Sequence, residues 1–220
     1  MKLIAENLTI DRGGRRVFED LSFSLEGGSA LVVTGANGIG KSSLLRTLAG
    51  LVSLAHGSIR LEGGAPDTPS EEHIHYFGHQ DAVKPALSVL ENLQFWQSFA
   101  AAAHVSGFSG SSVDPMDALN LLGIGHTARL PAAFLSAGQK RRLSLCRLLV
   151  TPRPVWLMDE PTSALDRVSE TQLLGLMNAH LAAGGLIVTA THSDLALEKT
   201  LILHLRAGDA AAPSPEEALQ

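Results

Sequence analysis

The sequence has little cysteine, no long apolar run and no excess of basic residues. Cys146 is the only cysteine among the 220 residues, so no disulfide can form within the chain and a reducing compartment is expected. No stretch of about 20 apolar residues occurs, which argues against a membrane-spanning helix. The first ten residues, MKLIAENLTI, contain Glu6 and lack a long apolar core, unlike a secretory signal. A role at a membrane would therefore need a partner that spans it.

Acidic residues outnumber basic ones, 22 to 17, and give a net charge of −5 with an isoelectric point near 6.0. Domains that bind nucleic acid are usually basic, so we expect no nucleic-acid partner. The composition is otherwise that of a globular protein, 45% hydrophobic and 18% charged. A chain of this length buries about 70% of its unfolded surface, enough for one core. We expect a single domain over residues 1–205 and a partly disordered tail over 206–220.

Short, continuously apolar runs alternate with helical patterns along the chain. SALVVTG at 29–35, VWLMD at 155–159 and LIVTATH at 186–192 are typical of strands buried on both faces. Buried strands separated by helices predict a mainly parallel sheet. Two alternating segments near the N-terminus predict further strands, and residues from about 81 to 150 predict an inserted helical subdomain. The expected fold class is α/β, with a parallel central sheet, an antiparallel β subdomain and this helical insertion.

The segment GANGIGKSS has the spacing of a phosphate-binding loop and lies between a predicted buried strand and a predicted helix. Glycines let the backbone wrap around phosphates, while N–H groups at the helix start point at the anion. Lys41 is expected to reach the β- and γ-phosphates, and the Ser42 hydroxyl to bind Mg²⁺. This context disfavours a chance glycine-rich turn. The predicted nucleotide-binding residues here are Gly35, Ala36, Asn37, Gly38, Ile39, Gly40, Lys41, Ser42 and Ser43.

Polar residues follow several of the predicted strands. Asp159 and Glu160 end the strand VWLMD, where Asp159 would hold Mg²⁺ and Glu160 would polarise the attacking water. A solvated acidic turn is the alternative, and the phosphate loop disfavours it. His192 ends another buried strand, and Gln80 closes the predicted strand HIHYFGHQ. Such residues are often structural, but ligands of this fold class bind at the carboxyl edge of the sheet.

The segment LSAGQKRR, residues 135–142, allows two interpretations. Ser136 and Gln139 have the spacing of a capping box that starts a helix. The same helix start also offers free N–H groups and a positive dipole to an anion. Both interpretations can hold together, so the segment predicts a second anion site in a chain that already has a phosphate loop.

Taken together, these motifs resemble the ATP-binding subunits of ABC transporters, in the family's order from about residue 2 to 205. The resemblance implies a P-loop NTPase of the ABC ATPase type that binds ATP and Mg²⁺. It also implies that two copies pack head to tail, with Ser136, Gly138 and Gln139 of each touching nucleotide held by the other. Asp166 would connect the two sites. The implied catalytic residues are Glu160, His192, Gln80 and Lys41, and the implied Mg²⁺ residues are Ser42, Gln80 and Asp159.

The sequence departs from the family pattern at two places. Ala137 replaces the second glycine of the usual signature segment, which adds a methyl group close to the backbone. An aromatic residue usually stacks on adenine shortly after the first strand, but here none precedes Phe18. Arg12 or Arg16 could cover the ring instead, and the sequence does not choose between them.

The segments YFGHQDAVKPALSVLENLQFW and LSAGQKRRLSLCRLLV resemble the ATP-binding subunits of cytochrome c maturation haem exporters. That resemblance implies a peripheral protein on the cytoplasmic face of the bacterial inner membrane. The implied partner is an integral membrane permease subunit, and the implied function couples ATP hydrolysis to haem delivery and release of a haem chaperone. Two alternatives stay open: another ABC transporter, for lipid, lipoprotein or a small solute, and a soluble ABC ATPase acting on the ribosome or DNA.

Three histidines invite a separate hypothesis of direct haem or metal binding. His73, His75 and His79 would share one face if residues 73–80 form a continuous strand. The alternative is a partly polar strand face with His79 near the nucleotide. We favour the alternative, because a metal site needs further groups that orient its ligands.

Overall fold

Two sheets form the framework of the molecule. The computed structural model describes residues 1–13, 15–64, 69–99, 108–163, 165–193 and 195–206, so the predicted tail lies outside the described residues beyond Arg206. The smaller sheet is antiparallel and has the order β2-β1-β4. Its strands are β1 (Lys2–Arg12), β2 (Arg15–Glu26) and β4 (His56–Glu62).

The larger sheet has five described strands in the order β5-β6-β7-β3-β8, and all of its recorded pairings are parallel. Parallel strands need crossover connections, which explains why strands that are neighbours in space are far apart in sequence. This arrangement confirms the predicted parallel central sheet. Its strands are β3 (Ser29–Thr34), β5 (Ile74–Phe77), β6 (Val155–Asp159), β7 (Leu186–Ala190) and β8 (Thr200–His204).

Both faces of the parallel sheet are covered, so the central strands β6 and β7 are buried at every position and are mostly apolar. In β6, Val155 and Leu157 belong to a core shared with the antiparallel sheet and α1 (Lys41–Leu48). Trp156 and Met158 point the other way, into a core shared with the helices. Alternate residues of a strand face opposite sides, so a strand between two cores reads as a continuous apolar run.

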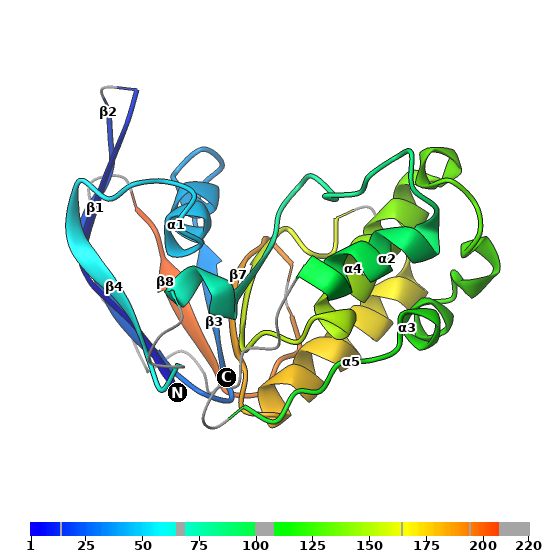
Figure 1. Ribbon diagram of the computed structural model, residues 1–220. Helices are drawn as coiled ribbons and strands as arrows, with labels where there is room; N and C mark the ends of the chain where they lie inside the picture. The colour runs from blue at the N-terminus through cyan, green and yellow to red at the C-terminus, as the bar shows by residue number, and fades with distance from the viewer. Residues whose placement is uncertain (14, 65–68, 100–107, 164, 194, 207–220) are drawn as a thin grey trace.

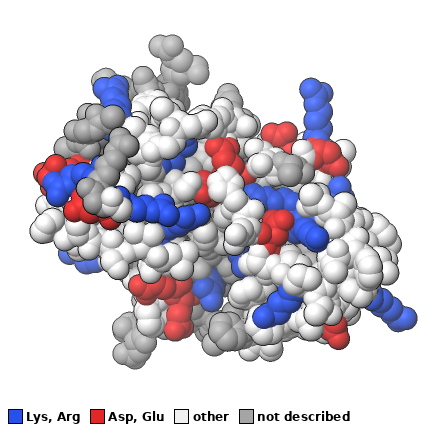
Figure 2. Space-filling view, turned by 90° about the horizontal axis from the view of Figure 1, so that it is seen from above, with Lys and Arg blue, Asp and Glu red and all other residues white. Residues whose placement is uncertain are grey.

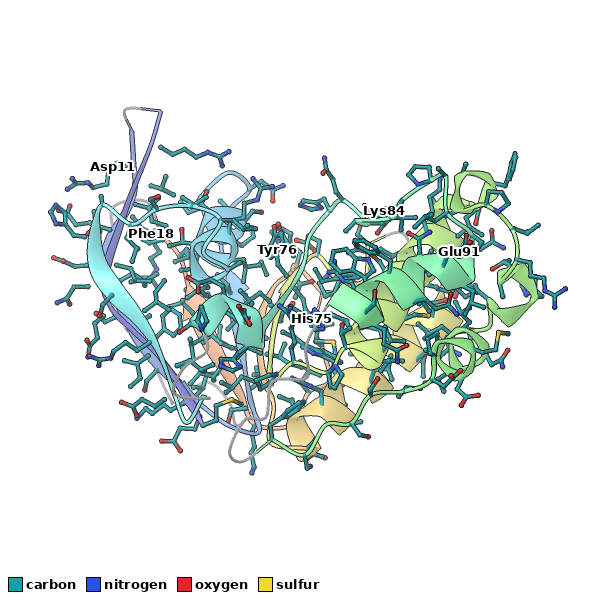
Figure 3. All side chains as sticks on the ribbon, in the orientation of Figure 1. Asp11, Phe18, His75, Tyr76, Lys84 and Glu91 are labelled. Carbon is teal, nitrogen blue, oxygen red and sulfur yellow. The ribbon has the colours of Figure 1, made fainter. Side chains whose placement is uncertain are left out.

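The molecule therefore has three parts side by side, with the antiparallel sheet at one end, α1 and the parallel sheet in the middle, and the other helices at the far end (Figure 1). Phe18, on β2, lies in the core between the antiparallel sheet and α1 (Figure 3). This confirms the predicted antiparallel and helical parts around a parallel sheet. The helices at the far end are α2 (Val89–Phe99), α3 (Pro115–Leu121), α4 (Ala137–Val150) and α5 (Arg167–Ala182).

Local polar contacts set the starts of these helices. The Asp114 carboxylate accepts hydrogen bonds from two N–H groups in the first turn of α3, and Pro115 occupies the first helical position. The capping box predicted at Ser136 and Gln139 is present and starts α4 at Ala137. Three short 3-10 helices complete the described helical segments: η1 (Ser70–His73), η2 (Gly125–Thr127) and η3 (Ala132–Phe134).

The strand predicted over residues 73–80 is shorter than expected. His73 belongs to η1, and β5 ends at Phe77, so Gln80 lies three positions beyond the strand. The backbone leaves the sheet at Gly78, whose carbonyl accepts a hydrogen bond from the Arg141 side chain.

The outside of the molecule is chemically mixed. Seen from above, acidic and basic side chains lie interspersed among uncharged residues (Figure 2). Within the described ranges, no helix combines the length and the apolar character that crossing a bilayer requires.

Candidate nucleotide-binding and catalytic site

The loop between β3 and α1 wraps tightly because glycine occupies its crowded positions. Gly35 and Gly40 have φ values of 139° and 123°, which residues with a side chain rarely adopt. A Cβ atom on Gly35 would lie 2.6 Å from the Leu205 carbonyl oxygen, and one on Gly40 would collide with Val17. Helix α1 starts directly after Gly40 without a side-chain cap, so its first N–H groups are left for an anion.

Lys41 connects this loop to the end of a distant strand. Its Nζ atom donates to the carbonyl oxygens of Gly35 at 2.7 Å and Ala36 at 3.3 Å, and lies 3.2 Å from Nε2 of His192. The same His192 nitrogen is 2.8 Å from Oδ1 of Asn37. The fold thus places His192, which follows β7, against the phosphate loop.

Asp159 ends β6 and is the buried carboxylate of the site, with 2% of the residue exposed. Its Oδ2 atom has no hydrogen-bond partner in the described part of the chain and lies 3.5 Å from Nε2 of His79. A buried carboxylate oxygen without a donor costs free energy. Oxygen ligands are also what Mg²⁺ prefers, so Asp159 together with the Ser42 hydroxyl fits a magnesium site.

Glu160 follows directly but has an unusual backbone conformation. Its φ of 48° lies in the left-handed region, which costs roughly 1–2 kcal/mol for a residue with a side chain. Three hydrogen bonds hold it there: its N–H donates to Ala190 at 2.8 Å, and its carbonyl accepts from Arg141 at 3.0 Å and from the Ser163 N–H at 3.1 Å. Glu160 Oε1 lies 3.8 Å from Nε2 of His192, so the fold brings these two predicted catalytic residues together.

One open cavity of about 330 Å³ is lined by Lys41, Asp159 and Glu160 among others, whereas the predicted site residues Gly35, Ala36, Ile39 and His192 are not part of its lining. Of the predicted site residues, Gln80 is exposed and is not part of this lining, whereas its neighbour His79 is. Arg12 also lines the cavity, while Arg16 is engaged by Asp11 and Glu19. The lining residues are Arg12, Asn37, Gly38, Gly40, Lys41, Ser42, Ser43, His79, Asp159 and Glu160.

The signature segment, residues 135–139, lies elsewhere, at the start of α4. Ser136 Oγ accepts a hydrogen bond from the Gln139 N–H, and Gln139 Oε1 accepts one from the Ser136 N–H. Ser136, Gly138 and Gln139 are not part of the cavity lining. Each molecule therefore presents its phosphate loop and its signature segment at different places.

Asp166 links α4, the helix that begins in the signature segment, to the segment that follows Glu160. Its carboxylate caps α5 by accepting from the Ser169 N–H at 2.8 Å, and it pairs with Arg142 of α4 at 3.1 Å. The hydrogen bonds from Ser169, helped by Arg142, lower the pKa of the exposed Asp166 carboxyl from its ordinary value.

The structure argues against the hypothesis that three histidines converge and agrees with the favoured alternative, in which His79 lies near the nucleotide site. His73 is in η1, and His75 is buried, with its Nε2 atom 2.5 Å from the Thr151 carbonyl oxygen. His79 lies in the nucleotide cavity beside Asp159. His75 lies in the middle of the molecule, between α1 and α2 (Figure 3). Among the residues that the structure describes, no group of three or more potential metal ligands occurs. The three histidines do not share a strand face, because β5 starts only at Ile74 and ends at Phe77.

Sequence reasoning missed one contact residue of the site, Arg141. Its buried side chain joins the backbone of Glu160 to the segment around Gly78 and Asp81. The doubled arginine in LSAGQKRR is the only signal, and it does not tell which arginine turns inward.

Comparison with known proteins agrees with this geometry. A family model described as "ABC transporter" matches residues 18–163, which is more than half of the chain. The chain therefore belongs to the ABC transporter family and is an ABC-type ATPase. Two solved structures share the fold. One is an ATP-binding subunit of an ABC transporter, with a TM-score of 0.82 and 22% identity, and the match covers 97% of this chain and 90% of that one. The other is a dimeric post-hydrolysis ATP-binding cassette bound to ADP and Pi, with a TM-score of 0.77 and 21% identity, and the match covers 96% of this chain and 97% of that one.

Near-full-length relatives give a more particular likeness. A protein of Nitrobacter winogradskyi is 52% identical over 96% of this chain and all of its own length. One of Rhodopseudomonas palustris is 53% identical over 90% of this chain and 94% of its own. Both are named "Cytochrome c biogenesis ATP-binding export protein CcmA". The resemblance to the cytochrome c maturation group is confirmed.

Proposed function

We propose that this chain is the ATP-hydrolysing subunit of a membrane export complex for cytochrome c biogenesis, where it couples hydrolysis to haem delivery and release of a haem chaperone. The observation that carries the proposal is the 52% identity with a relative of that name over its whole length. The cavity at the carboxyl edge of the parallel sheet supplies the chemistry. The matched region covers 96% of the chain.

The residues of the cavity take complementary roles in hydrolysis. Lys41 and the N–H groups of residues 35–43 neutralise the charge on the phosphates. Glu160 orients and polarises the attacking water, and His192 contacts the γ-phosphate while it stays close to Glu160. Catalysis of phosphoryl transfer depends mainly on positioning and electrostatic stabilisation, and rigid strand ends provide both.

Magnesium belongs to this proposal because its ligands are present. Asp159 and Ser42 line the same cavity, and Gln80 is two positions beyond Gly78, where the backbone leaves β5. When bound, Mg²⁺ neutralises charge on the β- and γ-phosphate oxygens. The unpartnered Oδ2 atom of Asp159 supports its assignment to the metal.

A second copy completes the proposed site. The signature segment Ser136–Gln139 presents a capped helix start away from the chain's own cavity, so it serves the nucleotide of another molecule. In a head-to-tail pair, two nucleotides lie between the phosphate loop of one copy and the signature of the other. Loss of the γ-phosphate then removes the contact that holds the pair closed.

An integral membrane permease subunit is the second proposed partner. Because no described helix can cross a bilayer, export requires a membrane-embedded partner, and the chain then acts as a peripheral subunit at the cytoplasmic face of the inner membrane.

Adenine would lie over Arg12, which lines the cavity, rather than over Arg16, whose guanidinium is engaged by two carboxylates.

Deletion and complementation in the source bacterium test this function. Deletion should abolish c-type cytochromes, measured by haem staining, while other haem proteins persist. The parent chain and the control Glu62→Gln, at an exposed acid of β4 outside the cavity, should restore them, and Glu160→Gln should not. Normal c-type cytochromes in the deletion strain would reject the assignment.

A further inference from the structure

Arg141 is a buried cation that contacts the backbone of Glu160. It lies on α4, in the turn that follows the signature segment, and only 4% of the residue is exposed. Its Nη1 atom donates to the carbonyl of Gly78 at 2.7 Å and to the Asp81 carboxylate at 3.3 Å. Its Nη2 atom donates to the carbonyl of Glu160 at 3.0 Å. One side chain thus joins three segments of the chain.

Packing fixes the guanidinium in this place. The ring of Phe77 lies 3.8 Å from the guanidinium carbon, a cation–π distance. Burial lowers the pKa of Arg141, and Asp81 opposes that shift by stabilising the charged form. Placing a cation here costs free energy unless its hydrogen bonds and its acidic partner compensate. Such an arrangement is rigid, because an arginine fork binds several acceptors in a fixed geometry.

The acceptor that matters for chemistry is the Glu160 carbonyl. Glu160 has a left-handed backbone, and hydrogen bonds to Ala190, to Arg141 and to the nearby Ser163 N–H hold it in that conformation. Of the two donors to its carbonyl, only Arg141 comes from a distant segment. Without Arg141, the carbonyl keeps only the hydrogen bond from the Ser163 N–H, which lies in the turn directly after Glu160 and does not tie it to a distant segment. The peptide group could then rotate toward a relaxed negative φ, and the carboxylate would leave its position near His192.

We infer that Arg141 is a positioning residue for ATP hydrolysis, which fixes the backbone of Glu160 and joins it to the segment 78–81 that contains Gln80. The inference rests on the ATPase function proposed above. It concerns no contact with nucleotide, since Arg141 is not part of the cavity lining. Arg141 lies only two positions after Gln139 on α4, so a movement of α4 would change the placement of Glu160.

Arg153 provides a matched control. It is a half-buried arginine that donates to two backbone carbonyls, Ile74 at 2.8 Å and Glu71 at 3.4 Å, near the start of β5. Burial lowers its pKa as well. It has no recorded contact with Glu160, so a loss of structural hydrogen bonds alone should look the same in both arginine variants.

The test compares Arg141→Gln and Arg153→Gln in the full chain, purified with the proteins that co-purify with it. Arg141→Gln should lower kcat roughly 10- to 100-fold with KM for ATP nearly unchanged, because the catalytic carboxylate is misplaced while the phosphate loop is intact. Arg153→Gln should keep kcat and KM. Arg141→Lys, which retains the charge and one donor, should recover part of the rate and covers the case in which Arg141→Gln does not fold.

A double-mutant cycle gives the deciding readout. In a Glu160→Gln background, Arg141→Gln should cause no further loss of the residual single-turnover rate, because the group that it positions is already gone. Equal fold losses in both backgrounds, or an Arg141→Gln enzyme with parental kcat, would overturn the inference. An unsubstituted chain that hydrolyses no ATP would instead reject the proposed function, so the two failures are distinguishable.

Discussion

Asp159 and Glu160 are adjacent in sequence but differ in environment. Asp159 is the last residue of β6 and is almost fully buried, with one carboxylate oxygen unpartnered. Glu160 turns out of the strand with a positive φ and is partly exposed in the cavity. The two side chains therefore suit different roles. A buried carboxylate with one unpartnered oxygen suits a cation, and a more exposed carboxylate can contact water.

Replacement of Asp159 separates metal binding from folding. Asp159→Asn should weaken Mn²⁺ binding at least roughly tenfold, because the charged ligand is lost. Without metal, the variant should be at least as stable as the parent, since a buried charge with an incompletely satisfied oxygen is removed. Mn²⁺ titration by electron paramagnetic resonance and urea melts in EDTA measure the two effects. Unchanged Mn²⁺ affinity would contradict the assignment.

A methyl group tests the shape of the phosphate loop. Gly40→Ala should weaken nucleotide binding at least roughly tenfold, because the new Cβ collides with Val17 at a φ of 123°. Gly175→Ala is the matched control, since this exposed glycine of α5 has nothing within 4 Å of the added carbon. It should bind ATP normally and gain about 0.5–1 kcal/mol in the free energy of unfolding. A fluorescent ATP analogue and urea melts report both, and normal binding by Gly40→Ala would argue against the tight loop.

At the scale of elements, α5 and β6 are joined by a buried histidine. The ring of His180 stacks on Trp156 with centroids 3.9 Å apart, and its Nε2 atom hydrogen-bonds the Pro154 carbonyl at 3.1 Å. Burial in this contact lowers the pKa of His180 to about 4, from an ordinary value of 6.5. The helix therefore packs on the sheet through a neutral imidazole.

This contact predicts acid sensitivity. Since the pKa is lower in the folded state, the unfolded chain takes up the proton first, so the stabilisation is complete above pH 6.5 and is lost as the pH falls toward about 4. The full effect is about 3 kcal/mol for this group. Urea melts between about pH 7.5 and pH 4.5 should show a shallower pH dependence for His180→Gln, whose amide can still donate to Pro154. An unchanged slope would show that His180 is not the responsible group.

The elements that the sequence predicted well depend on local patterns. The continuous apolar run of β6 and the capping box of Ser136 and Gln139 follow from neighbours within a few positions, so spacing alone indicates them. Arg141 differs, because its acceptors on Gly78 and Glu160 are backbone carbonyls 63 and 19 positions away. Neither acceptor has a side-chain type that a sequence could reveal. The same long-range contact accompanies the early end of β5. Because the local sequence pattern does not reveal it, the sequence predicts one strand over residues 73–80.

At the scale of the whole molecule, the topology gathers the site from distant segments. The phosphate loop follows β3, the acidic pair follows β6 and His192 follows β7, and these three strands are parallel and adjacent in the order β6-β7-β3. Their carboxyl ends therefore meet at one edge, as expected for a fold that binds ligands there. The sequence order of motifs predicted this meeting, and the favoured interpretation of His79 placed it near the nucleotide, but the sequence did not show that Gln80 is outside the cavity lining. The position of Gln80 depends on where β5 ends.

The signature segment is the part of the predicted site that does not lie at the carboxyl edge of the parallel sheet. This separation leads to a prediction about assembly. Glu160→Gln should bind ATP, hydrolyse it roughly a hundredfold more slowly than the parent, and accumulate as a dimer in size-exclusion chromatography with light scattering. ADP should return it to the monomer, because no γ-phosphate remains to join Ser136 of one copy to Lys41 of the other. Adding Ser136→Glu should abolish the dimer while each copy still binds ATP, since a second negative charge would face the γ-phosphate. Ser98→Glu, at an exposed serine of α2, is the control and should dimerise normally. A Glu160→Gln chain that stays monomeric with ATP, or one that dimerises despite Ser136→Glu, would show that the signature segment does not act across the pair.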